Sequence, residues 1–194
     1  RFIVTGWSWS PANSTDVYLV RTDDAGRKLW ERSFGGSGSD YGYAVLPLQD
    51  GGYAIAGSTG SFGPSVDAYL VRTGKDGRTL WEEIYGGTGD DAGFGLLSAE
   101  DTGFVIAGST GSFGPSRDIF LVRTGSDGTL LWEQHFGGTG TQEGRSIART
   151  GDGGFLIAGG TDPALSGLWD AYVVRTDSHG LLQWERSIGR GTSG

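Results

Sequence analysis

The stretch from Asp67 to Gly87 is DAYLVRTGKDGRTLWEEIYGG, and close copies of it begin at Asp16, Asp118 and Asp170. The four starting points are 51, 51 and 52 residues apart. Each copy contains two short runs rich in β-branched and aromatic residues, with a Gly-containing turn between them. A period near fifty residues built from such runs is typical of a β-propeller or another stacked β array. We therefore interpret each copy as the two outer strands of a propeller blade.

The copies share large and charged side chains at fixed places. The shared aromatic residues are Trp30, Trp81, Trp132 and Trp184, each followed by a Glu. The shared cations are Arg21, Arg72, Arg123 and Arg175. A residue repeated in every copy is most simply explained by its part in building every copy. We expect the indoles to be buried between neighbouring blades. The Arg and Glu side chains are expected to pair across the hairpin or to cap backbone groups of the next blade.

Two further strands precede the outer pair in each unit. In the second unit they are Asp40 to Pro47 and Gly52 to Thr59, followed by Asp67 to Thr73 and Thr79 to Tyr85. Turns rich in Gly and Asp separate these runs. Strands such as Tyr69-Leu70-Val71 are apolar on both faces, so they need cover on both sides. Blades packed between neighbouring blades provide that cover.

Glycine indicates which strand lies innermost. Gly42, Gly93 and Gly144 occupy one place in the first strand of each unit, and a small residue follows two positions later. Innermost strands converge on the propeller axis, where a missing Cβ permits close approach. This strand is therefore predicted to be innermost and the Trp-bearing strand outermost.

The sequence thus predicts an all-β fold, a single β-propeller over residues 1–194 with four-stranded antiparallel blades of about 51 residues. The predicted blades are residues 1–36, 37–87, 88–138 and 139–190. Because Phe2 to Gly6 aligns with Tyr53 to Gly57, the first blade lacks its innermost strand. The chain is either an arc of a larger propeller or a four-bladed ring missing one strand. We favour the arc, since an unpaired channel strand would expose backbone groups. Further blades or another chain are then needed to close the ring.

Composition excludes several classes of function. The net charge of −8 disfavours nucleic acid and anionic membranes as partners. The absence of Cys excludes disulfides, thiolate metal sites and cysteine catalysis. No apolar run approaches the roughly 20 residues of a membrane-spanning helix, and no residue pattern indicates a metal site or a cofactor. The absence of Met and the excess of Arg over Lys favour a thermostable protein.

Functional residues are expected where the repeat is broken. The loops after the second and fourth strands of each unit emerge on one face of the predicted disc, here called the loop face. The candidate ligand-binding residues on it are Trp7, Trp9, Phe62, Phe113, Trp169, Asp90 and Asp91. Aromatic side chains beside carboxylates suit a protein or glycan partner. The alternative is that these side chains only pack the loops.

The outer strands also carry a resemblance. Leu70-Val71-Arg72-Thr73, followed by Gly77 and Trp81, resembles the tryptophan-docking motif of quinoprotein-type propellers, in which the Trp wedges against the next blade. The chain departs from that motif at Thr73 and its equivalents, where the family usually has Asp. The whole unit, with W-E-x-x-[FYI]-G and D-x-G-[YF]-x-I-A-G, is similar to β-propeller repeats of bacterial and archaeal secreted or surface proteins. That resemblance implies an extracellular or cell-surface scaffold and no reaction.

The sequence favours a non-enzymatic scaffold or binding module that interacts through its loop face. One alternative is a multivalent, lectin-like propeller, because the loops Gly57 to Ser65 and Gly108 to Ser116 are nearly identical. A second alternative is a fragment of a quinoprotein- or glycosidase-type enzyme. The adjacent carboxylates Asp90 and Asp91 would suit glycosidase chemistry at a separation of about 5 to 9 Å. Nothing else in the sequence supports catalysis.

Overall fold

The computed structural model describes residues 1–9 and 14–189, and these residues contain strands, turns and loops but no helix. The strands, in chain order, are β1 (Phe2–Trp9), β2 (Thr15–Thr22), β3 (Lys28–Phe34), β4 (Asp40–Pro47), β5 (Tyr53–Thr59), β6 (Asp67–Thr73), β7 (Thr79–Tyr85), β8 (Asp91–Ser98), β9 (Phe104–Thr110), β10 (Asp118–Thr124), β11 (Leu130–Phe136), β12 (Thr141–Arg149), β13 (Phe155–Asp162), β14 (Asp170–Thr176) and β15 (Leu182–Ile188). Residues 10–13 and 190–194, which include the last residue of the fourth predicted blade, lie outside the described part.

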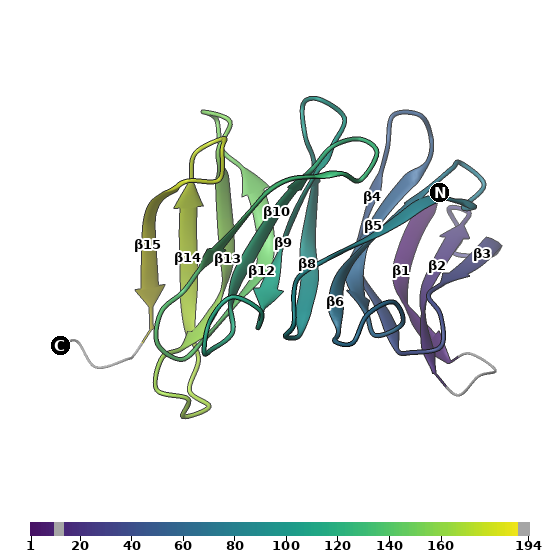
Figure 1. Cartoon of the computed structure of the whole chain (residues 1–194). Helices are drawn as coiled ribbons and strands as arrows, with labels where there is room; N and C mark the ends of the chain where they lie inside the picture. The colour runs from purple at the N-terminus through teal and green to yellow at the C-terminus, as the bar shows by residue number, and fades with distance from the viewer. Residues whose placement is uncertain (10–13, 190–194) are drawn as a thin grey trace.

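The strands form four antiparallel sheets in which each strand pairs with its neighbours in sequence (Figure 1). The first sheet has the order β1-β2-β3, and the other three have four strands each, β4 to β7, β8 to β11 and β12 to β15. The all-β class and the repeated antiparallel unit are thus confirmed. Each sheet lies within one of the four residue ranges predicted as blades.

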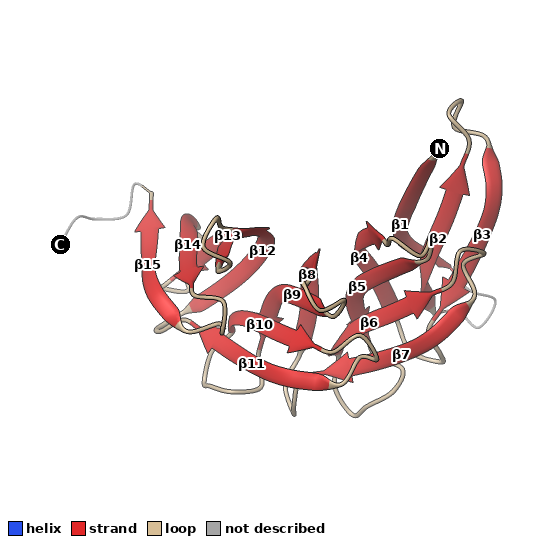
Figure 2. Cartoon of the chain, turned by 90° about the horizontal axis from the view of Figure 1, so that it is seen from above, coloured by secondary structure: helices blue, strands red, loops and turns tan. Residues whose placement is uncertain are grey.

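Seen from above, the sheets follow an open arc (Figure 2). β4, β8 and β12 lie on its concave side, and β7, β11 and β15 lie on its convex side. The Gly-containing strand is therefore the innermost strand of each four-stranded sheet, and the Trp-bearing strand is the outermost. Within the described residues the sheets do not close into a ring, so a closed propeller stays a prediction.

The core consists of three apolar layers, one at each boundary between successive sheets. At the first boundary, Val17 and Leu19 of β2 pack in one cluster with Ile55 of β5 and Val71 of β6, and all four are fully buried. The middle sheets have a layer on each face, and β5 and β6 are buried along their whole length. Cover on both faces explains why these strands are continuously apolar.

An indole from the outermost strand lies at each boundary. The ring of Trp30 meets Tyr53 of the next sheet at 5.8 Å between centroids. It also covers the turn at Gly77, where an added Cβ would lie 2.7 Å from Trp30 Cζ3. The same contacts join Trp81 to Phe104 and Gly128, and Trp132 to Phe155 and Gly180. Three of the four repeated Trp side chains therefore lie between sheets.

The repeated Arg side chains act mainly within their own sheets. Arg72 pairs with Asp50, which lies in the turn between β4 and β5, and donates to the carbonyl of Thr73. The equivalent pairs are Arg123 with Asp101 and Arg175 with Asp152. The partner is thus the turn Asp and not the Glu that follows each Trp. The first sheet has no such turn, and Arg21 donates instead to the Tyr53 hydroxyl at 2.7 Å.

Candidate functional site

Each four-stranded sheet has an irregularity at the same place in its innermost strand. The pairings of β4 with β5, β8 with β9 and β12 with β13 all shift register there, which leaves one extra residue without a partner in the ladder. A bulge of this kind bends the strand and redirects a side chain. The extra residues are Tyr43, Phe94 and Arg145. Equivalent backbone positions thus present three different side chains.

Glycines next to the bulges allow the innermost strands to pack closely. A Cβ added to Gly42 would lie 2.4 Å from Thr5 Oγ1 of the preceding sheet. A Cβ added to Gly93 would lie 2.6 Å from Ile106 Cγ2. No real Cβ tolerates such distances without movement of its neighbours. At Gly42 the close neighbour belongs to the preceding sheet, as the sequence predicted, whereas at Gly93 it is Ile106 of the same sheet.

The bulged residues belong to a continuous row of side chains, here called the inner row. Trp7 of β1 meets Tyr41 of β4 edge-on at 5.6 Å, and Tyr41 lies parallel to Tyr43 at 6.3 Å. Tyr43 contacts Phe94 of β8 at 4.9 Å. The guanidinium of Arg145 from β12 lies 4.5 Å from the centre of the Phe94 ring, within cation–π range. The inner row thus joins β1 of the first sheet to the innermost strands of the other three, and Trp7 and Tyr43 are exposed along it.

Charged groups gather at the Arg145 end of the inner row. Arg145 pairs with Glu143, and Arg117, from the loop between β9 and β10, lies 3.6 Å from the same carboxylate. Glu143 is mostly buried, whereas much of the Arg145 side chain is exposed. Two guanidinium groups around one carboxylate give this end a local positive charge on an acidic protein. The row therefore combines exposed aromatic faces with hydrogen-bond donors.

The structure brings the loops after the second and fourth strands to one end of the sheets, as predicted for the loop face. Ser61 Oγ accepts from the amides of Gly36 and Gly38 at 3.0 and 2.9 Å. Ser112 repeats this contact one sheet later, accepting from the Gly89 amide at 3.0 Å. Hydrogen bonds between the two kinds of loop therefore build this end of the second and third sheets.

Phe62 and Phe113 occupy equivalent places in these loops. The Phe62 ring lies 5.7 Å from Tyr69, and the Phe113 ring lies 5.8 Å from Phe120. Phe113 also stacks on His135 at 5.1 Å with the rings nearly parallel. Both Phe side chains pack on their own sheets and keep an exposed face. They form two matching positions that do not belong to the inner row.

The other predicted aromatic residues are separate from one another. Trp9 ends β1 and is the most exposed of them, at 78%. Trp169 lies in the loop between β13 and β14, against Gly160, and lines a hollow of about 630 Å³ together with Leu168 and Ile188. Of the predicted aromatic residues, only Trp7 belongs to the inner row.

Asp90 and Asp91 have different environments although they are adjacent. Asp90 is exposed, and its Oδ1 accepts weakly from the Val66 amide at 3.4 Å. Asp91 is 1% exposed, and its Oδ2 accepts from the Gly87 amide at 3.0 Å and from Ser112 Oγ at 2.7 Å. Asp91 thus joins the loop between β7 and β8 to the loop between β9 and β10, and of the two residues only Asp90 presents a carboxylate to solvent.

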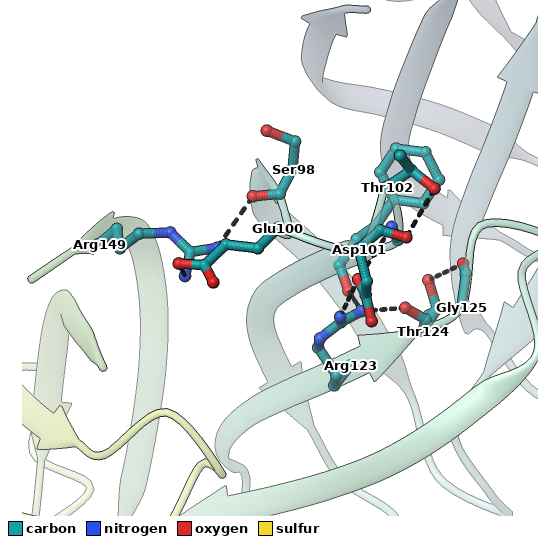
Figure 3. A network of polar contacts seen from close by, with 10 residues as sticks. Ser98, Glu100, Asp101, Thr102, Arg123, Thr124, Gly125 and Arg149 are labelled. Carbon is teal, nitrogen blue, oxygen red and sulfur yellow. Dashed lines mark hydrogen bonds and ion pairs between the residues drawn. The ribbon is translucent and has the colours of Figure 1, made fainter. Parts of the chain in front are cut away.

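The opposite end of the sheets carries a second polar cluster, which the sequence analysis did not single out as a site (Figure 3). Arg149 donates to the Ser98 carbonyl at 3.1 Å and lies 3.6 Å from Glu100. Arg123 pairs with Asp101, and this hydrogen bond lowers the pKa of the Asp101 carboxyl below its ordinary value. These side chains line a hollow of about 610 Å³ between the third and fourth sheets. Because its cations face carboxylates, we interpret this cluster as a bridge between sheets.

Sequence reasoning missed four residues of the inner row, Tyr41, Tyr43, Phe94 and Arg145. A signal for the bulged three is present. Each follows the repeated Gly of the innermost strand and precedes a small residue, as in Gly42-Tyr43-Ala44. A variable residue between two small ones, at a fixed place in a repeat, indicates a position where each unit exposes a different side chain.

Neither a scan against protein-family models nor a search of curated proteins finds a match to this sequence. In residues 1–9 and 14–189, no three His, Asp or Glu side chains gather in a way that could hold a metal ion. The same residues contain no helix that is long and apolar enough to cross a membrane.

Proposed function

We propose that this chain is a non-enzymatic binding module of the β-propeller class, which interacts through its loop face and the adjoining inner row. The observation that carries the proposal is the set of three equivalent bulges. They place three different side chains next to one another, with Phe94 in contact with both Tyr43 and Arg145. The strands that carry them, β4, β8 and β12, lie on the concave side of the arc (Figure 2). The repeated Trp and Arg residues, in contrast, are used to join and brace the sheets.

The inner row suits a ligand with both apolar faces and hydrogen-bonding groups. Exposed aromatic rings offer large contact area at a small cost in side-chain entropy. Arg145 adds donors beside the rings, and Glu143 holds its guanidinium in place. A peptide segment or an oligosaccharide has this combination of surfaces. Location outside the cell or on its surface is part of the proposal and rests on the resemblance to secreted propeller repeats.

A multivalent glycan-binding protein is the second candidate. The observation that favours it is the equivalence of Phe62 and Phe113, which lie in nearly identical loops and each keep an exposed ring face. Two equal sites one sheet apart would strengthen binding to a repeating glycan through effective concentration.

Arrays of oligosaccharides and of short peptides test both candidates, with hits measured by isothermal titration calorimetry. The double variant Tyr43→Ala/Phe94→Ala is expected to weaken binding at least tenfold, or about 1.4 kcal/mol. Leu80→Ala, an exposed substitution on the outermost strand β7, is the matched control and should bind as the parent does.

Each outcome of this experiment separates the candidates. Loss of binding in Tyr43→Ala/Phe94→Ala supports the inner row as the contact surface. Loss only in Phe62→Ala/Phe113→Ala, with oligosaccharides as the hits, supports the second candidate. A parent protein that binds nothing on either array contradicts the proposal that the chain is a binding module.

A further inference from the structure

The first and last sheets of the arc each have one face that no other described sheet covers (Figure 2). In the interior of the arc, every boundary joins one face of a sheet to the opposite face of the next sheet. The uncovered face of the last sheet is equivalent to the face that each earlier sheet turns toward the next sheet. The uncovered face of the first sheet is equivalent to the face that each later sheet turns toward the preceding sheet. The two ends therefore carry the two halves of one interface.

The last sheet presents the half that carries the indole. At its edge, Ile188 is 63% exposed, whereas its equivalents Phe34, Tyr85 and Phe136 are each 6% exposed. Trp184 is 40% exposed, and among the described residues no turn lies against it as Gly77, Gly128 and Gly180 lie against the three earlier indoles. We call this surface the donor face, and it comprises Ala171, Val173, Trp184 and Ile188.

The first sheet presents the half that receives the indole. Phe2 is 59% exposed, whereas the equivalent aromatic residues Tyr53, Phe104 and Phe155, which meet the preceding indoles, are at most 6% exposed. Val4 is 55% exposed, and its equivalents Ile55, Ile106 and Ile157 are buried. We call this surface the acceptor face, and it comprises Phe2, Val4, Tyr18, Val20 and Gly26.

Gly26 shows how open the acceptor face is. Its equivalents Gly77, Gly128 and Gly180 each lie under the indole of the preceding sheet, at 2.6 to 3.0 Å from an added Cβ. A Cβ added to Gly26 would meet nothing within 4 Å among the described residues. The turn itself is the same, because all four glycines have φ between 76° and 86°. An indole could therefore be placed over Gly26 without remodelling the turn.

We propose that the donor face of one copy of this chain docks on the acceptor face of a second copy, with Trp184 over Gly26 and against Phe2. The interface continues an arrangement that the chain forms three times within itself. Such a contact is head-to-tail, so it leaves an open chain of copies unless the rotation closes a ring. Two copies give a ring of eight sheets, within the usual range of about four to eight blades, whereas three copies exceed it. The expected assembly is therefore a closed dimer.

Sedimentation velocity on the 194-residue chain tests the assembly directly. At micromolar concentration the expected particle has twice the 20.4 kDa mass of one chain. A monomer under these conditions would overturn the proposal, and further repeats of a longer polypeptide would then be the cover for both faces.

Complementation tests the head-to-tail geometry. Trp184→Arg disables only the donor face, and Val4→Arg disables only the acceptor face. Each variant alone should dissociate at least tenfold more readily than the parent. An equimolar mixture should form a one-contact dimer, because one variant retains the acceptor face and the other retains the donor face. Circular dichroism and thermal unfolding confirm that both exposed substitutions leave the fold intact.

Two results would contradict this geometry. Dimers that survive in both single variants would place the interface elsewhere, and a mixture that stays monomeric would exclude the donor–acceptor pairing. Leu182→Ala is the matched control on the same strand as Trp184. Its equivalents Thr79 and Leu130 are exposed although another sheet covers the faces of their sheets. Leu182 therefore lies outside the proposed interface, and the dimer should persist in this variant.

Discussion

Trp81 and Trp184 occupy the same place in two copies of one repeat, yet they have different surroundings. Trp81 lies between two sheets, against Phe104 and over Gly128, whereas Trp184 lies on an uncovered face. Each repeat therefore carries two halves of an interface, one on each face of its sheet. Whether the Trp side chain is buried depends on whether another sheet lies against that face. Stability in such an arrangement comes from contacts between adjacent units as much as from any unit alone.

The largest expected effect comes from removing an indole inside the arc. Trp81→Ala should lower the free energy of unfolding by about 3 kcal/mol, because it leaves a cavity between two sheets. Trp184→Ala should change it by less than about 1 kcal/mol in dilute, monomeric protein, since no sheet of residues 1–9 and 14–189 covers that side chain. Urea denaturation followed by fluorescence measures both. Equal losses in the two variants would contradict the distinction between the boundary and the end face.

Glycine substitutions test the same comparison from the receiving side. Gly77→Ala and Gly26→Ala share the strain of a positive φ, about 1 kcal/mol. Only at Gly77 does the new methyl group also collide with the indole of Trp30. Gly77→Ala should therefore cost about 1 to 3 kcal/mol more than Gly26→Ala. Thermal unfolding of the two variants gives this difference. A difference near zero would mean that the Trp30 ring can move away from the new methyl group without loss of stability.

Most of the fold could be predicted from the sequence because local composition encodes it. The ranges predicted for the innermost strand Asp40–Pro47 and for the outer strands Asp67–Thr73 and Thr79–Tyr85 agree with the structure. Turn residues bound each of these strands, and their apolar runs need cover on both faces. The order from innermost to outermost could also be predicted, since close approach demands Gly at one edge.

The candidate site could be predicted only in part because it depends on pairing between strands. A regular strand sends successive side chains to opposite faces, and the register shift beside Gly42 breaks that rule for Tyr43. No local pattern reveals such a shift without the partner strand. Asp90 and Asp91 show the same difficulty. They are adjacent in the sequence, and only the strand pairing decides that Asp91 is buried and Asp90 is exposed.

The smallest expected effect is a difference in pH-dependent stability between two boundaries inside the arc, because a carboxylate faces Asp67 at one of them and a neutral side chain faces Asp118 at the other. At the second boundary, burial and then the charge of Asp91 raise the pKa of Asp67 above its ordinary value of 3.8. At the third boundary, burial raises the pKa of Asp118 and the charge of His135 opposes this rise, while a neutral Gln142 stands where Asp91 stands one sheet earlier. A carboxyl group with a raised pKa contributes its full stability below pH 3.8 and loses it as the pH rises through the folded-state value.

Asparagine removes this loss because it stays neutral at every pH. Relative to the parent, Asp67→Asn should therefore gain stability between pH 3 and pH 7, by under about 1 kcal/mol. Asp118→Asn, the matched control, should gain less, because no carboxylate occupies the place opposite it. Urea denaturation of the three proteins at both pH values measures these gains. An equal gain in the two variants would contradict the expectation that the facing Asp91, and the absence of a cation among the described residues beside it, make ionised Asp67 less stable at neutral pH than ionised Asp118.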